Sequence, residues 1–89
     1  MSAAYWTAAR LATLRADIDE FERLAFTAQF RSLNERKSAM STTAQACNDD
    51  NIRGLLGGSI DYLAKHPEWI RSKISLAREH VQLLMERHK

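Results

Sequence analysis

The chain has 89 residues, of which 45% are hydrophobic and 27% are charged, and it carries a formal net charge of +2. This length makes one small domain, and the near balance of charge excludes a strongly basic domain built for nucleic acid. Three Gly and one Pro leave little material for the turns of a sheet protein, so we predict a single all-α domain over residues 1–89. The single cysteine, Cys47, excludes an intrachain disulfide.

Three features of the sequence indicate a cellular location. No apolar run approaches the ~18 residues of a membrane span, and the first residues lack the pattern of a secretory signal. An unpaired cysteine is typical of a reducing compartment. We therefore expect a cytoplasmic protein that does not contact a membrane.

Residues 3–37 contain neither Gly nor Pro and are predicted to form one long helix. A line of apolar residues with helical spacings of three and four predicts its core side. These residues are Leu11, Leu14, Ile18, Phe21, Ala25 and Ala28. Phe26, Phe30 and Leu33 keep helical spacing but lie about 100° away from that line. A helix of this length would extend for ~50 Å, more than either later helix could cover, so we expect these three residues to form a self-interface.

A polar stretch of small residues, 38–43, is predicted to form the first loop. A second helix is predicted over about residues 43–65, with either Thr42 or residues 48–50 as its N-terminal cap. Its apolar line consists of Ile52, Leu55, Leu56, Ile60 and Leu63.

Three glycines weaken this second helix. Gly54, Gly57 and Gly58 would each cost about 1 kcal/mol in a helix interior, relative to alanine. We favour a continuous helix of low stability, because the apolar spacing runs through the glycines without a change of phase. The alternative is a break at Gly57 and Gly58, after which Ser59 caps a new turn.

A third helix is predicted over residues 67–87. Pro67 suits the first helical position, and Glu68 suits the positive dipole of the first turn. The main apolar line of this helix is Ile70, Ile74, Ala77, Val81 and Leu84. Short connections favour antiparallel neighbours, so we expect an antiparallel helical hairpin or a three-helix bundle. We also expect a homodimer, because burial in so short a chain barely exceeds the cost of ordering it.

The third helix carries a second apolar line, about 130° from the first, in which residues recur every seven positions with basic residues between them. One interpretation is that this side packs against a symmetry-related copy, and the other is that it binds a different protein. The predicted partner-binding residues are Trp69, Lys73, Leu76, His80, Leu83 and Arg87.

These patterns predict a small cytosolic protein-interaction module, such as a regulatory adaptor, an inhibitor or a chaperone-like partner. It would act by helix-mediated binding or occlusion of another protein. The alternative is a weak nucleic-acid-binding regulator that uses the basic side of the third helix. Residues 65–89 contain six basic and three acidic residues, which is a mild positive excess.

No pattern in the sequence indicates catalysis or a cofactor. His66, His80 and His88 are too dispersed for a local metal pair, and no second cysteine is present. The carboxylates of the first helix are typical of a solvated face. We therefore expect no enzymatic activity, no cofactor and no metal site.

Overall fold

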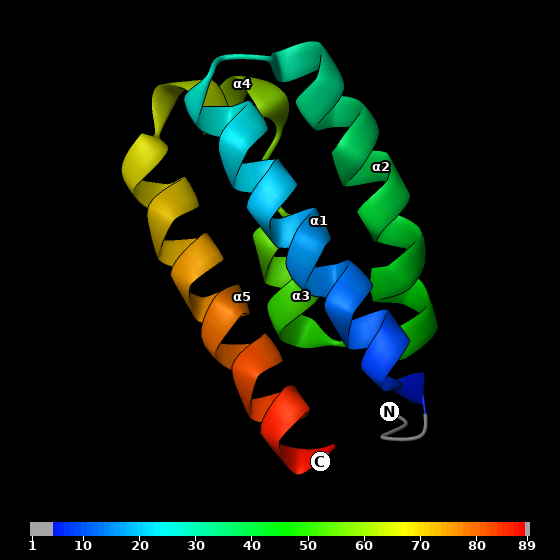
Figure 1. Ribbon diagram of the computed structural model, residues 1–89. Helices are drawn as coiled ribbons and strands as arrows, with labels where there is room; N and C mark the ends of the chain where they lie inside the picture. The colour runs from blue at the N-terminus through cyan, green and yellow to red at the C-terminus, as the bar shows by residue number, and fades with distance from the viewer. Residues whose placement is uncertain (1–4, 89) are drawn as a thin grey trace.

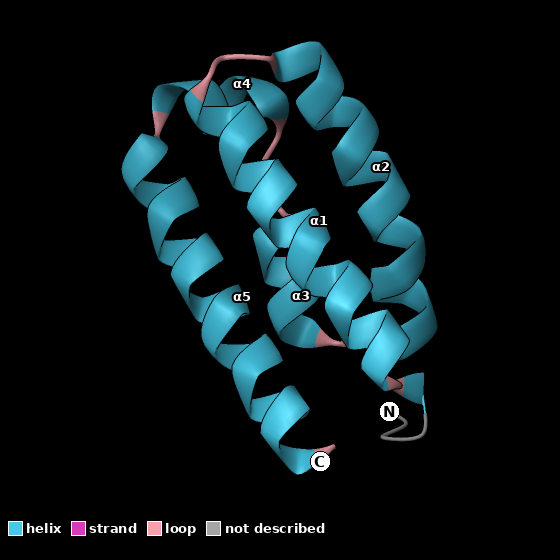
Figure 2. Ribbon diagram, viewed as in Figure 1, coloured by secondary structure: helices cyan, strands magenta, loops and turns pink. Residues whose placement is uncertain are grey.

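The computed structural model describes residues 5–88, which contain five α-helices and no strand (Figures 1 and 2). The predicted all-α class is confirmed. The helices are α1 (Ala8–Phe26), α2 (Phe30–Cys47), α3 (Asp50–Leu55), α4 (Ile60–Lys65) and α5 (Pro67–Arg87). The expected first two helices are each divided, so the hairpin of one long and two shorter helices does not describe this part of the chain.

The three long helices, α1, α2 and α5, lie side by side, with α1 between the other two (Figure 1). The short helices α3 and α4 lie behind α1 in this view, and each contacts both α2 and α5. The four sides of the bundle are therefore α1, α2, α5 and the broken segment α3–α4. The molecule measures 37 × 20 × 19 Å along its principal axes.

The predicted helix over residues 3–37 is wrong, because α1 ends at Phe26 and the chain reverses before Phe30. Residues 3 and 4 of that prediction lie outside the described part of the chain. Ala28 adopts a left-handed conformation with φ of 57°, and the Gln29 amide donates to the Leu24 carbonyl at 3.0 Å. This conformation costs an alanine about 1 kcal/mol, but it lets α2 return along α1 and bury its own apolar side.

The predicted loop at residues 38–43 is also wrong, because these residues lie inside α2. Small polar residues disfavour a helix only weakly, whereas Leu33, Met40 and Ala44 have helical spacing and are all buried. Burial of this side outweighs the weak local preference. The helix ends at Cys47, after which Asn48 adopts a left-handed conformation with φ of 54°.

The predicted continuous helix over residues 43–65 is replaced by α3 and α4, so the alternative of a break is the correct one. The Ser59 hydroxyl accepts from the Tyr62 amide at 3.1 Å and caps α4, as that alternative proposed. Gly58 is buried in the break, where an added Cβ would lie 2.9 Å from Leu63 Cδ2 and 3.3 Å from the Trp69 ring. A larger residue at this position would therefore require the Leu63 and Trp69 side chains to shift.

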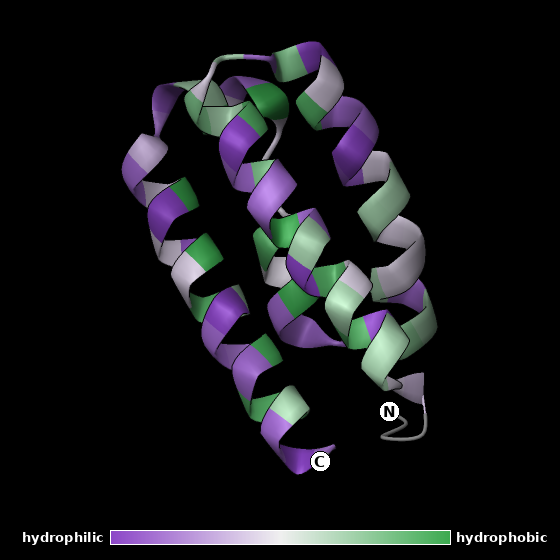
Figure 3. Ribbon diagram, in the orientation of Figure 1, coloured by the Kyte–Doolittle hydropathy of each residue, from purple (hydrophilic) through white to green (hydrophobic). Residues whose placement is uncertain are grey.

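The core agrees with the predicted apolar lines of the first and third helices. The buried residues of the helices form one cluster, and Figure 3 shows the hydrophobic residues of α5 mainly on the side facing α1. The predicted third helix is confirmed, since α5 spans Pro67–Arg87. Ala28 is the exception on the first line, because it lies exposed in the turn after α1. The buried residues of the two lines are Leu11, Leu14, Ile18, Phe21, Ala25, Ile70, Ile74, Ala77 and Val81.

Replacing Ala28 with glycine is expected to stabilise the protein by about 0.5–1 kcal/mol, because glycine adopts positive φ without steric cost. In a continuous helix the same change would destabilise by about 1 kcal/mol, so the sign of the effect reports the turn. Urea denaturation measures this sign. Ala16→Gly is the matched control, since Ala16 is exposed in the middle of α1 and its replacement is expected to destabilise. A loss of stability in both variants would contradict the turn at Ala28.

Candidate partner-binding surface

The outer side of α5 presents two leucines to solvent. Leu76 and Leu83 are 48% and 52% exposed, and they are two of the four large hydrophobic residues that are exposed among those described. The buried line of α5 holds the opposite side of the helix in the core, so these leucines cannot turn inward. They lie two helical turns apart on one line, as the sequence predicted.

Charged residues of opposite sign border this leucine line. At about 100° per residue, Lys73, His80 and Arg87 fall on one flank. Glu79 and Glu86 fall on the other flank. We call the two leucines and these five charged or titratable residues the α5 outer face. Its composition, an apolar line between a basic and an acidic flank, is typical of a helix that packs lengthwise against another helix.

Trp69 belongs to the same line but is mostly engaged within the chain. It is half-buried against the core, and its ring meets that of Tyr62 edge-on at a centroid distance of 5.6 Å. The Lys73 ammonium lies 5.6 Å from the centroid of the Trp69 ring. The indole therefore joins α4 to α5, and only part of its surface is left for the partner that the sequence predicted.

Sequence reasoning did not single out Tyr62, which is 42% exposed on α4. Its ring stacks on His66 at a centroid distance of 4.3 Å and also contacts Trp69. The signal that could have identified it is the spacing of four residues between Tyr62 and His66, which brings the two rings onto one side of a helix.

His80 was predicted to bind a partner, but it is held by Asp49 at the beginning of α3. His80 Nε2 lies 2.5 Å from Asp49 Oδ2, and the two side chains are only 20% and 12% exposed. The other oxygen of Asp49 accepts from the amides of Asn51 and Ile52 at 2.9 and 3.1 Å. Asp49 thus caps α3 and joins it to α5, so His80 positions the helix and has little surface left for a partner.

The expected self-interface of Phe26, Phe30 and Leu33 is not a continuous surface. Leu33 is fully buried within its own chain, and Phe30 is half-buried against the core. Phe26 is 39% exposed at the end of α1, with the Arg71 guanidinium 5.1 Å from its ring centroid. The prediction is wrong for Leu33, because the turn after α1 brings α2 back onto the core.

One arginine of α5 is neutralised by acidic residues of α1. Arg78 donates to Glu22 at 2.6 Å and to Asp19 at 2.7 Å, and both carboxylates belong to α1. These hydrogen bonds raise the pKa of Arg78 above its ordinary value. The side of α5 that faces α1 is therefore less positive than a count of its basic residues indicates.

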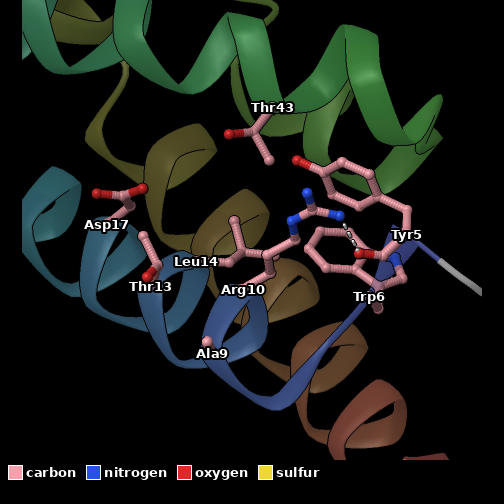
Figure 4. Close-up of a pocket in the computed structure, with 8 residues that line it drawn as sticks. All are labelled: Tyr5, Trp6, Ala9, Arg10, Thr13, Leu14, Asp17 and Thr43. Carbon is pink, nitrogen blue, oxygen red and sulfur yellow. Dashed lines mark hydrogen bonds between the residues drawn. The ribbon is translucent and has the colours of Figure 1, made fainter.

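A small, mainly apolar cavity of about 170 Å³, with a few polar groups in its lining, lies between α1 and α2 (Figure 4). Arg10 enters it, with its guanidinium 4.3 Å from the centroid of the Tyr5 ring and Nη1 donating to the Tyr5 carbonyl at 2.8 Å. Asp17, farther along the same helix, accepts from Arg36 at 2.8 Å. Because both charged groups are bound within the chain, this cavity is a weaker candidate than the α5 outer face.

Cys47 does not have the environment of a reactive thiol. It is 2% exposed, and burial, with the nearby negative charge of Asp49, raises its pKa above the ordinary value. The neutral thiol is a poor nucleophile and a poor metal ligand. Cys47 therefore serves as a small apolar residue of the core.

Three further observations bear on the chemistry of the chain. Within residues 5–88, no three His, Cys, Asp or Glu side chains come together as metal ligands. None of the helices described here has the length and apolar character needed to cross a membrane. No known protein family, curated protein or solved structure matches this chain.

Proposed function

We propose that this protein is a small protein-interaction module whose α5 outer face binds a helix of its partner. The observation that carries the proposal is the exposure of Leu76 and Leu83, seven residues apart on a helix whose other side is fixed in the core. A partner helix laid along α5 would remove both leucines from water. Binding of this kind acts by occlusion of the partner's surface, as in a regulatory adaptor, an inhibitor or a chaperone-like protein.

The energies expected at this surface indicate a reversible interaction. Covering the exposed half of each leucine contributes about 1 kcal/mol, so the two together provide only part of a stable complex. The two charged flanks add little affinity but restrict which helices fit and in which direction they run. The α5 outer face is therefore suited to selective binding that can be released.

Weak nucleic-acid binding by the basic side of α5 is the second candidate, and it has less support. Arg78 is bound to Glu22 and Asp19, and Arg71 lies over Phe26, so these two charges are partly engaged. A salt titration separates the two functions. Binding to phosphates weakens steeply as salt rises, whereas apolar helix docking changes little.

The double variant Leu76→Asp with Leu83→Asp tests the proposed function. We expect it to reduce partner binding or self-association by at least roughly tenfold, because two charges would be buried in the interface. The measurement is capture of proteins from the source cell's lysate on the immobilised chain, followed by affinity measurement with the captured protein.

Ser75→Asp with Gln82→Asp is the matched control. These residues are also exposed on α5 and seven apart, but they lie about 100° from the leucine line. We expect this control to bind like the wild type, and circular dichroism should show both double variants to be folded. Equal binding by the leucine variant and the wild type would rule out the α5 outer face.

A further inference from the structure

We propose that the helix bound by the α5 outer face is α5 of a second copy of this chain, running parallel to the first around a two-fold axis. This inference rests on the proposed function and names its partner. Leu76 would then contact Leu76 of the second copy, and Leu83 would contact Leu83 of the second copy. The two apolar layers would lie two helical turns apart, about 10 Å along the helix.

The order of charges around α5 determines this direction. Arg87 lies on one side of the leucine line and Glu86 on the other, and Glu79 lies on the acidic side one heptad earlier. In a parallel pair, each flank faces the opposite flank of the second helix, so Arg87 lies beside Glu86 of the second copy along both edges. In an antiparallel pair that sets Leu76 against Leu83, like flanks face each other, which brings Glu79 close to Glu79 of the second copy.

Three charges of the outer face are available for an intermolecular contact. Among the described residues, Glu79, Glu86 and Arg87 are exposed and form no ion pair within the chain. Glu86 accepts only a side-chain hydrogen bond from Gln82, at 3.1 Å. The acidic residues of α1 differ in this respect, because each of them is bound to an arginine of the same chain. Those pairs are Asp17 with Arg36, Asp19 and Glu22 with Arg78, and Glu20 with Arg23.

The contact is short, so the dimer is expected to be weak and to dissociate on dilution. Two leucine layers bury far less surface than the ~1,600 Å² of a standard stable interface. Trp69, which continues the line toward the beginning of α5, is half-buried and adds only a partial third layer. Sedimentation equilibrium should show a mass that rises with concentration from 10.2 kDa toward twice that value.

Charge reversal tests which flanks meet. Glu86→Arg makes both flanks basic at this level of the helix, and Arg87→Glu makes both flanks acidic. We expect each variant alone to weaken self-association by roughly tenfold, because two attractive pairs become two repulsive pairs. An equimolar mixture should restore dimers to the wild-type strength, since the flanks are then complementary again. Wild-type association by both variants alone would overturn the proposal.

Disulfide trapping tests the direction of the helices. In a parallel pair, Leu83→Cys places the two introduced thiols side by side, so this variant should form a covalent dimer by itself on mild oxidation. In an antiparallel pair, only a mixture of Leu83→Cys with Leu76→Cys would crosslink efficiently, and that result would overturn the parallel arrangement. Cys47 can stay in place because it is buried, and the wild type serves as the control for its reactivity.

A foreign partner gives a different set of results. If the wild type stayed at 10.2 kDa at every concentration tested, the second copy would be excluded as the partner. The proposed function would still stand if Leu76→Asp with Leu83→Asp lost a captured protein that the Ser75→Asp with Gln82→Asp control retained. The failure of this inference and the failure of the proposed function are therefore distinguished by separate measurements.

Discussion

Replacing Leu33 with alanine is expected to destabilise the monomer by about 2–5 kcal/mol, a large fraction of the stability of a small domain. Leu33 lies on α2 and has 0% of its surface exposed. Alanine would leave a cavity in the core that the surrounding helices cannot fill, and the transfer energy of the lost side-chain atoms adds to that cost. The measurement is the free energy of unfolding in urea, monitored by circular dichroism at low protein concentration.

Leu83→Ala is the matched control, since the same side-chain atoms are removed from a residue that is 52% exposed. At a concentration where the protein is monomeric, this change is expected to cost less than about 0.5 kcal/mol. The sequence predicted both leucines to lie at interfaces with another chain. The comparison tests that Leu33 instead stabilises the core, whereas Leu83 does not. If Leu33→Ala were as mild as Leu83→Ala, α2 would not pack against the core as described.

Replacing Asp49 with alanine is expected to cost about 2–3 kcal/mol, because one side chain makes two kinds of stabilising contact. Loss of an N-terminal cap costs about 1 kcal/mol, and loss of a largely buried polar partner for His80 adds about 1–2 kcal/mol. The free energy of unfolding at neutral pH measures the total. The amides of Asn51 and Ile52 donate hydrogen bonds to Asp49. Faster hydrogen exchange of these two amides in the variant would show that the first turn of α3 opens more often.

Asp50→Ala is the control for this prediction. Asp50 also lies in the first turn of α3, but its side chain is 97% exposed and forms only an i,i+3 pair with Arg53, so the expected cost is below about 0.5 kcal/mol. A double-mutant cycle of Asp49→Ala with His80→Gln should show a coupling energy of at least about 0.5 kcal/mol. Purely additive effects would mean that α3 and α5 are not joined through this pair.

Local signals in the sequence predicted the parts of the fold that neighbouring residues decide. Pro67 at the first helical position and the apolar spacing after it defined the bounds of α5. The Ser59 cap was recognised as the alternative to a continuous helix, and the structure adopts it. These features depend on hydrogen bonds and side-chain spacings within one or two turns of the chain, so they are visible without knowledge of the fold.

The turn after α1 had no such signal. Ala28 is neither glycine nor asparagine, yet it adopts positive φ, and no proline marks the break. Residues 38–43 likewise have the polar composition of a loop, but they lie in α2. In both places the local preference is worth about 1 kcal/mol or less, whereas burial of Leu33 and Met40 contributes several times more. Packing between distant segments therefore overrode the local preference.

The same division applies to the α5 outer face. The heptad spacing of Leu76 and Leu83 and the charges on either side are properties of the sequence, and they follow once the segment is helical. Tertiary structure alone decided which of the predicted residues stay accessible. Trp69 is covered by α4, and His80 is bound by Asp49, which lies 31 residues away in the chain. Helical periodicity is a local property, but exposure depends on which other helices the bundle places beside each side chain.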